Sequence, residues 1–279
     1  MNDPIVPCLW FDGKAQEAAD FYVRVFPDAE KSADAGVTVS MRVADLDLTL
    51  LNGGPEFPIN PSISFFYNCR SEAEIGKLWG ALSEGGSILM ELGEYPFARR
   101  YGWIADTYGV NWQLILHDEA PRQRAFPSLM FTRGLTGRAE EAIRFYASVF
   151  KDAEIGNLGR YGPGMEPDRE GTLSYGELRL GSRWLTAMDS AQPHQFEFSE
   201  GVSLVVTCED QAEVDYFWER LSEGGSEGQC GWLKDRYGVS WQVVPRILGE
   251  LMSDPERAPR VVEAFMKMRK LDIATLAGT

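Results

Sequence analysis

A nine-residue motif occurs twice in the chain, and both copies carry a glutamine that packing alone does not explain. The copies are DTYGVNWQL at 106–114 and DRYGVSWQV at 235–243. Each predicts a turn closed by a glycine and then a strand, whose side chains alternate between two faces. One face takes the apolar residues, including a core tryptophan. The other face takes Asn111 and Gln113 in the first copy, and Ser240 and Gln242 in the second. Because this amide recurs, it is the first candidate for ligand contact.

The composition limits the classes of function that remain. The chain has 279 residues, of which 44% are hydrophobic and 25% charged, and this is typical of a globular protein with a substantial core. A formal charge of −15 repels phosphate backbones, so we expect no nucleic-acid partner. No apolar run is long enough to span a bilayer, and no signal segment is recognised, so we expect no membrane partner. Four cysteines without CxxC spacing favour reduced thiols and a cytoplasmic location.

Internal repeats divide the chain into two halves. Phe21-Tyr-Val-Arg-Val-Phe26 recurs as Phe145-Tyr-Ala-Ser-Val-Phe150, and Leu82-Ser-Glu-Gly-Gly86 recurs as Leu221-Ser-Glu-Gly-Gly225. Such offsets indicate repeated structural units. We predict a first domain over residues 1–118, a second over 125–245 and a helical tail over 246–279, with a polar linker that includes Arg124.

Hydrophobic periodicity predicts the order strand, helix and three strands twice in each half. A capping box at Ser71–Glu74 begins the second helix of the first half. The second half is shorter between its double glycine and Gly231, so it loses most of a strand. In the tail, Asp254-Pro255 predicts a helix start. Its apolar stripe through Val261 and Phe265 can dock on the chain itself, the commoner outcome, or on a partner subunit in a homodimer.

In these features the chain resembles the vicinal oxygen chelate superfamily, which has the glyoxalase and bleomycin-resistance fold. It is most similar to the PhnB-like branch, often labelled 3-demethylubiquinone-9 3-methyltransferase. The resemblance rests on Phe-Tyr-x-x-Val-Phe in each half, on Gly-Trp-x-x-Asp-x-Tyr-Gly-Val-x-Trp-Gln and on the tail from Val262 to Ile273. It implies an α+β fold of tandem glyoxalase-like domains, each a pair of βαβββ modules that form a cupped mixed sheet. We expect each half to close its own cup.

The resemblance also says where a metal would bind. The three ligand places of metal-using members fall on Val6 or Pro7, Ser62 and Gln113, and in the second half on Phe126 or Pro127, Gly201 and Gln242. A neutral amide brings no charge to offset a divalent cation, and aliphatic groups cannot coordinate one. We therefore expect no metal and no cofactor. The glycine-rich turn of a Rossmann-type methyl-donor site is also missing, so we expect no methyltransferase activity.

The predicted cup of the first domain is aromatic and poor in charged groups, which is typical of small-molecule sites. We predict that a small, largely apolar or aromatic organic molecule binds in the cup of the first domain without a metal. Two alternatives stay open: a metal-independent enzyme that uses Cys8 or Arg100, and an interaction protein with vestigial cups. Whether the protein is an enzyme is left undecided. The candidate ligand-binding residues are Cys8, Trp10, Ser64, Phe66, Arg100, Asn111, Gln113, Met130, Ser240 and Gln242.

Overall fold

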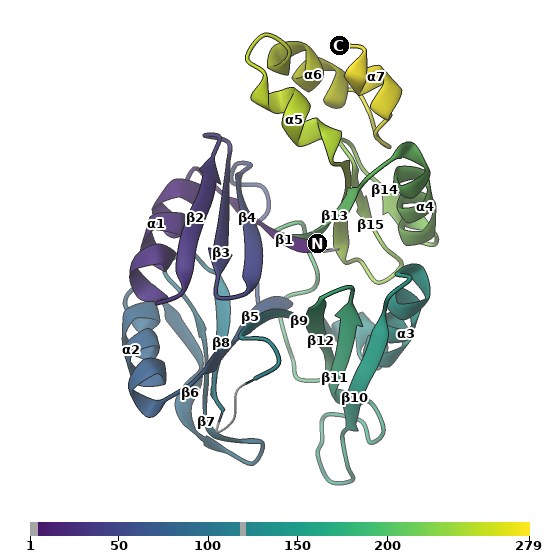
Figure 1. The fold of residues 1–279 in the computed structure, drawn as a ribbon. Helices are drawn as coiled ribbons and strands as arrows, with labels where there is room; N and C mark the ends of the chain where they lie inside the picture. The colour runs from purple at the N-terminus through teal and green to yellow at the C-terminus, as the bar shows by residue number, and fades with distance from the viewer. Residues whose placement is uncertain (1–4, 118–120) are drawn as a thin grey trace. The chain divides into compact units, whose positions relative to one another are not determined.

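The chain is an α+β protein built from four βαβββ modules and a tail of three helices (Figure 1). The computed structural model describes residues 5–117 and 121–279. No helix among these described residues is long and apolar enough to cross a membrane. The chain divides into one compact unit over residues 7–202 and another formed mainly by residues 203–279.

The predicted order of elements is confirmed in all four modules. Module 1 holds β1 (Val6–Phe11), α1 (Ala15–Val25), β2 (Ala29–Asp34), β3 (Thr38–Val43) and β4 (Leu46–Asn52). Module 2 holds β5 (Ile63–Cys69), α2 (Glu72–Ser83), β6 (Ser87–Tyr95), β7 (Ala98–Ala105) and β8 (Asn111–Leu116). Module 3 holds β9 (Ala125–Thr132), the 3₁₀ turn η1 (Arg133–Leu135), α3 (Ala139–Val149), β10 (Glu154–Arg160), β11 (Leu173–Leu180) and β12 (Arg183–Ser190). Module 4 holds β13 (Val202–Cys208), α4 (Gln211–Ser222), β14 (Ser226–Glu227), β15 (Trp232–Lys234) and β16 (Ser240–Pro245).

The sheet of the 7–202 unit that matters for the site combines modules from both sequence halves. Its strand order is β10-β11-β12-β9-β5-β8-β7-β6, so module 2 continues into module 3. The junction is the antiparallel pair of β5 and β9, with Ser64 opposite Ser128 and Phe66 opposite Phe126. The expectation that each half closes its own cup is therefore wrong for this sheet. The physical reason is that β5 and β9 each leave one edge unpaired within their own module, and pairing these edges satisfies both backbones.

The remaining strands extend the same module pattern. Within the 7–202 unit, module 1 runs in the order β1-β4-β3-β2, and within residues 203–279, module 4 runs β14-β15-β16-β13. Module 4 has the predicted short wall: β14 and β15 have two and three residues, whereas β6 and β7 have nine and eight.

The repeated DxYGVxW motif has a structural role that centres on its aspartate. Asp106 is buried, and its carboxylate accepts hydrogen bonds from Tyr108 N (2.8 Å), Val110 N (3.1 Å), Trp112 Nε1 (3.0 Å) and Tyr22 Oη (2.8 Å). In the second copy Asp235 accepts from Tyr237 N, Val239 N and Trp241 Nε1. The motif therefore closes a turn and ties it to a core tryptophan, which gives the repeated aspartate and tryptophan a structural role.

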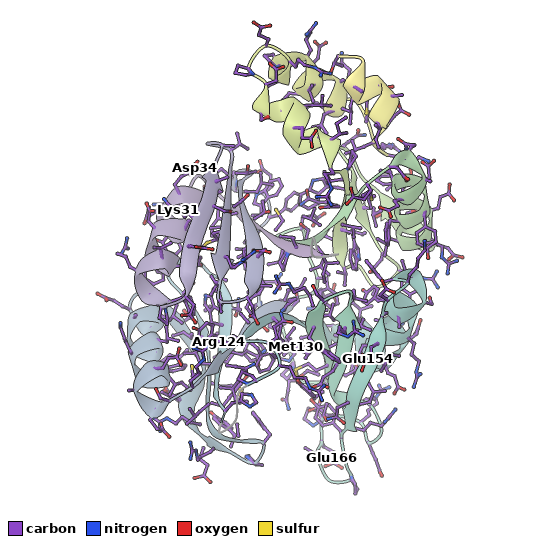
Figure 2. The ribbon with its side chains drawn as sticks, in the orientation of Figure 1. Lys31, Asp34, Arg124, Met130, Glu154 and Glu166 are labelled. Atoms are coloured by element: carbon purple, nitrogen blue, oxygen red, sulfur yellow. The ribbon has the colours of Figure 1, made fainter. Side chains whose placement is uncertain are left out.

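Arg124, which the sequence places in a polar linker, is instead a buried junction of modules 1, 2 and 3 (Figure 2). Its guanidinium pairs with Asp28 after α1 and with Glu74 of α2, and it donates to Tyr67 Oη at 2.7 Å. Its backbone N–H donates to Asp45. A buried cation with two carboxylates and a phenol around it fixes where β9 begins relative to α2.

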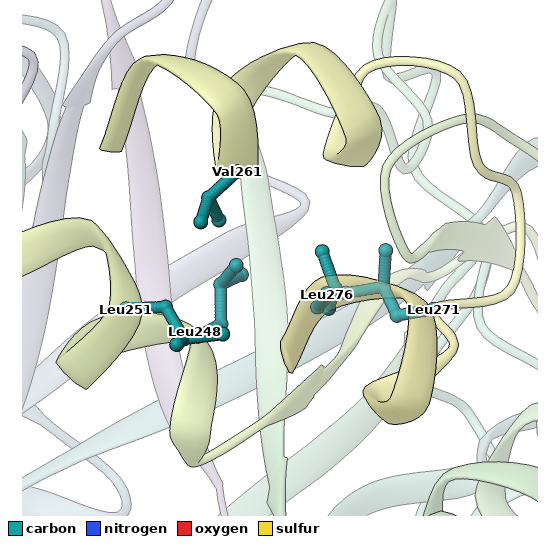
Figure 3. Close-up of a cluster of buried hydrophobic side chains, with 5 residues drawn as sticks. All are labelled: Leu248, Leu251, Val261, Leu271 and Leu276. Atoms are coloured by element: carbon teal, nitrogen blue, oxygen red, sulfur yellow. The ribbon is translucent and has the colours of Figure 1, made fainter. Parts of the chain in front are cut away.

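The tail packs on its own chain as three short helices, α5 (Ile247–Ser253), α6 (Ala258–Phe265) and α7 (Ile273–Ala277). Figure 3 shows five buried side chains between them: Leu248, Leu251, Val261, Leu271 and Leu276. Phe265 and Met268 pack against this cluster, as the stripe predicts. The predicted helix start at Pro255 is wrong, because residues 255–257 form turns and α6 begins at Ala258. Backbone bonds from Cys230 N to Met268 O and from Gly231 N to Arg269 O join the tail to module 4.

Candidate functional site

The candidate site lies on the face of the β10–β6 sheet that α2 and α3 leave uncovered, called here the helix-free face. On β7, Gly102 faces α2, since a Cβ there would lie 2.4 Å from the Trp79 ring. On β11, Gly176 faces α3, since a Cβ there would lie 2.7 Å from Ile143. Side chains alternate along each strand. Tyr101, Trp103, Tyr175 and Glu177 therefore point to the helix-free face.

Gln113 lies at the middle of the helix-free face in a fixed hydrogen-bond chain. Tyr101 Oη donates to its Oε1 at 2.5 Å, and its Nε2 donates to Ser64 Oγ at 2.7 Å. Gln113 is 2% exposed, and burial raises the pKa of Tyr101, which keeps that phenol protonated as the donor. The chain places a neutral amide and two hydroxyls where three strands meet. It offers polarity without charge.

The same amide-to-hydroxyl bond occurs in module 4. Gln242 Nε2 donates to Ser203 Oγ at 2.9 Å, across the parallel pair β13 and β16. In both copies the glutamine side chain reaches the neighbouring strand, where its amide donates to a serine hydroxyl. The recurrence of the glutamine therefore has a structural cause as well as a place on a candidate surface.

A cluster of aromatic and methionine side chains lies beside Gln113 on the helix-free face. Tyr101, Trp103 and Met130 are buried together. The partly buried side chains that pack against them are Phe66, Met90, Tyr95, Ala98, Ile115, Met188 and Phe196. The indole Nε1 of Trp103 is buried without a hydrogen-bond partner among the described residues. Methionine and aromatic side chains adapt to flat apolar surfaces, so this cluster suits an aromatic ligand.

A pocket of about 220 Å³ opens on the helix-free face beyond Phe66. Phe126 belongs to the pocket lining, and its ring stacks on Phe66 with the centroids 5.1 Å apart. This contact joins the pocket to the rest of the helix-free face. The residues that line it are Asn68, His117, Pro121, Arg122, Gln123, Phe126, Tyr175, Glu177, Trp184 and Thr186. Three aromatic rings thus form its walls, and polar side chains lie between them, so the pocket can both bury and orient a small molecule.

Two buried polar atoms of residues in the pocket wall are unsatisfied. Asn68 and Thr186 are 3% and 2% exposed. Asn68 Nδ2 donates to the carbonyl of Gln123 at 2.6 Å, which fixes the orientation of the amide. Its Oδ1, like Thr186 Oγ1, has no hydrogen-bond partner in residues 5–117 and 121–279. An unsatisfied buried polar atom costs about 1–3 kcal/mol, so both atoms favour a further hydrogen-bond partner.

Glu177 brings a held carboxylate to the pocket. Asn157 N donates to its Oε2 at 3.0 Å, and Tyr175 Oη donates to its Oε1 at 3.2 Å. Burial raises the pKa of Tyr175, so its phenol remains a donor. Gly156 makes room for this arrangement, because a Cβ there would lie 2.6 Å from Glu177 Oε2 and 2.9 Å from the Trp184 ring. Three strands therefore position one negative charge beside aromatic walls.

The structure brings five of the ten predicted site residues onto the helix-free face. Ser64, Phe66, Asn111, Gln113 and Met130 all belong to β5, β8 or β9. Asn111 donates from Nδ2 to Gly109 O at 3.0 Å, and its buried Oδ1 is unpartnered in the described part of the chain.

The other five do not lie on this face, although Arg100 belongs to the same sheet. Cys8 and Trp10 are on β1, which pairs with β4; Cys8 is buried, and Trp10 Nε1 donates to Gly54 O at 2.7 Å beside a separate hollow of about 460 Å³. Ser240 and Gln242 are on β16 in the other compact unit. Arg100 is not at a mouth of the helix-free face: it points toward α2, with its Nε 3.9 Å from Glu72, because it alternates with Tyr101.

Sequence reasoning missed most of the pocket wall. The alternation of Ser64, Phe66 and Asn68 along β5 predicts that Asn68 lies on the same face as the first two. Trp184, Thr186 and Met188 alternate along β12 in the same way. The sequence does not place the β12 residues near Gln113, because that requires the pairing of β5 with β9.

Metal ligands are not gathered at this site. In the described ranges 5–117 and 121–279, no group of three His, Cys, Asp or Glu side chains lies close enough to hold an ion. On the helix-free face, the strand positions beside Gln113 carry Ser64 and, across the β5–β9 junction, Ser128. These neutral groups are poor ligands for a divalent cation.

The chain is similar to a known family and to solved structures. The profile of the family described as 3-demethylubiquinone-9 3-methyltransferase matches residues 3–115 and 123–244. A solved structure from Bacillus cereus, titled a putative 3-demethylubiquinone-9 3-methyltransferase and PhnB protein, is 31% identical over 40% of this chain and 98% of its own, with a TM-score of 0.38. Glyoxalase I from Zea mays is 15% identical over 91% of this chain and 97% of its own, with a TM-score of 0.60. The search of curated proteins found no match.

Proposed function

Because the chain belongs to the PhnB-like family described as 3-demethylubiquinone-9 3-methyltransferase, within the vicinal oxygen chelate superfamily, we propose that it binds a small, largely apolar or aromatic organic molecule without a metal. The ligand lies on the helix-free face of the β10–β6 sheet, and enters the pocket beside Phe126. The fold class by itself selects no activity, so the proposal rests on the site.

The observation that carries the proposal is the pocket itself. An aromatic-walled hollow of about 220 Å³ adjoins the one face where Ser64, Phe66 and Gln113 meet. Flat apolar ligands gain from burying area against such rings, at about 25 cal/mol per Å². The polar groups of the wall then orient the ligand.

Metal independence is supported by the bonding of Gln113. Both ends of its amide are already engaged, with Tyr101 and with Ser64. To free Gln113 for an ion, two buried hydrogen bonds would be lost, and a neutral amide would provide little in return. We therefore assign Gln113 to shaping the face.

The four cysteines support the proposed cytoplasmic location. All are free thiols, and Cys8, Cys69 and Cys208 are buried. Burial raises the pKa of Cys69 and, to about 12, that of Cys208, which leaves both as unreactive thiols. A reducing compartment is the ordinary setting for such a set.

The experiment is a ligand-detected NMR screen of small aromatic compounds against protein dialysed with EDTA. We expect binders that compete with one another for one site. Thr186→Met should abolish their binding, because the longer side chain fills the pocket. Thr38→Met, at a half-buried position of β3, is the control and should leave binding unchanged. Binding that needs added zinc or nickel, or a folded Thr186→Met that binds as well as wild type, would refute the proposal.

A further inference from the structure

We infer that the pocket selects a planar ligand that bears N–H donors, and specifically an aromatic ring that carries a cationic nitrogen base, such as an arylamidine. The inference rests on the proposed function, because it concerns the same pocket, and it adds the ligand's chemical class.

Hydrogen-bond counting is the first argument. Asn68 Oδ1 can only accept, and its partner Gln123 O prevents the amide from being reversed. Thr186 Oγ1 can accept or donate, and it is unsatisfied among the described residues. Glu177 can only accept while ionised. Asn68 Oδ1 and the Glu177 carboxylate therefore need a hydrogen-bond donor. Thr186 Oγ1 can also accept a hydrogen bond from one.

Charge is the second argument. Glu177 is held by Asn157 N and Tyr175 Oη, so its carboxylate stays in place whether or not a ligand is present. A hydrogen bond between an ionised carboxylate and a cationic N–H is about twice as strong as a neutral one. A ligand with a delocalised cation therefore gains more here than its neutral isostere.

Among the described residues that line the pocket, Arg122 is the one arginine or lysine, and its side chain is exposed. Its guanidinium is over the Trp184 ring, 5.6 Å from the centroid. An exposed charge is strongly screened by water and salt. The half-buried Glu177 should therefore outweigh it, and an anionic ligand should lose to a cationic one.

Shape is the third argument. Phe126, Tyr175 and Trp184 provide flat walls around the acceptors. Cations lie favourably against aromatic faces, which adds about 0.5–2 kcal/mol depending on desolvation. Gly156 preserves this geometry, because any Cβ at that position would displace both Glu177 and Trp184.

The test compares three probes of one shape: benzamidine, a cation; benzamide, which is neutral; and benzoate, an anion. Dissociation constants are measured on the full chain by ligand-detected NMR titration. We expect benzamidine to bind about tenfold more tightly than benzamide, and benzoate to bind least. Glu177→Gln keeps the shape and should weaken benzamidine about tenfold, while benzamide is unchanged.

Glu154→Gln on β10 is the matched control, because it removes an exposed carboxylate that pairs with Arg179 outside the pocket lining. It should leave all three constants unchanged, which separates the pocket from the general attraction of a chain with net charge −15. Equal binding of the three probes, preference for benzoate, or an equal loss in Glu154→Gln would overturn the inference. If such probes and indole bind competitively but without preference, the proposed function stands alone; if none binds, both fail.

Discussion

Arg124→Ala should destabilise the protein far more than the loss of an ordinary surface arginine. The guanidinium is 8% exposed, and it is the shared partner of Glu74, 16% exposed, and Asp28, 39% exposed. Removing one partner of a buried ion pair costs about 3–5 kcal/mol, because the other charge remains buried. Asp28 is too exposed to contribute fully, since water screens it. The loss of the hydrogen bond to Tyr67 Oη adds to the total.

We therefore expect about 3 kcal/mol for Arg124→Ala, the low end of that range. In a chain of this size, that lowers the Tm by about 6–12 °C. Arg144→Ala is the control: Arg144 pairs with Glu140 on the exposed surface of α3, with 59% of its side chain accessible. Such a pair is worth about 0.3–0.5 kcal/mol, so the Tm should move by only ~1–2 °C. Arg124→Lys should fall between the two, since a single ammonium cannot reach Asp28, Glu74 and Tyr67 together.

Differential scanning calorimetry measures the Tm of all three variants, and urea denaturation measures their free energy of unfolding. The reasoning fails if Arg124→Ala is no less stable than Arg144→Ala. It also fails if Arg124→Ala and Glu74→Gln add independently in the double variant, because residues in one buried network should show coupling.

Three further perturbations follow from the structure. Burial raises the pKa of Asp106 to about 6, above the unfolded value of about 3.9, so this group stabilises the fold below pH ~4 and that contribution is lost as pH rises through 6. Between pH 4 and pH 7 wild type should lose ~2–3 kcal/mol relative to Asp106→Asn in urea denaturation, and a pH-independent difference would contradict this. Leu276→Ala in the tail cluster should lower the free energy of unfolding by about 2–4 kcal/mol, because the side chain is fully buried. Val262→Ala, at an exposed site of α6, should lower it by under ~0.5 kcal/mol. Equal melting temperatures of the two variants would mean that the tail is not docked. Gln113→Glu should take up no stoichiometric zinc after dialysis, since Ser64 and Tyr101 remain its neighbours, and metal found by plasma emission at one equivalent would show that ligands converge there.

Sequence repeats predict the modules well, because each βαβββ unit carries its own periodicity, caps and turns. The capping box is confirmed, since Ser71 Oγ accepts from Glu74 N at 3.1 Å. The side of the sheet that Gln113 occupies also follows from alternation alone. What local patterns cannot predict is which module edges pair, because β5 has a suitable edge for any antiparallel partner.

That one pairing explains most of the differences at the site. Cys8 and Trp10 belong to the β1–β4 pair, so they do not share a sheet with Gln113. Arg100 differs for another reason: its place depends on the phase of alternation in β7, which is set by the contact of Gly102 with Trp79. Arg124 differs because a charged linker residue is buried only when several partners from distant segments meet it.

Native mass spectrometry of the protein purified from its own host, with metals measured on the same sample, tests the central claim most directly. The account predicts the mass of the chain plus one small organic molecule, with no metal ion at one equivalent, and loss of that molecule in Thr186→Met but not in Thr38→Met. A metal ion at one equivalent that the organic molecule requires for binding, or an organic molecule retained fully by Thr186→Met, would contradict it.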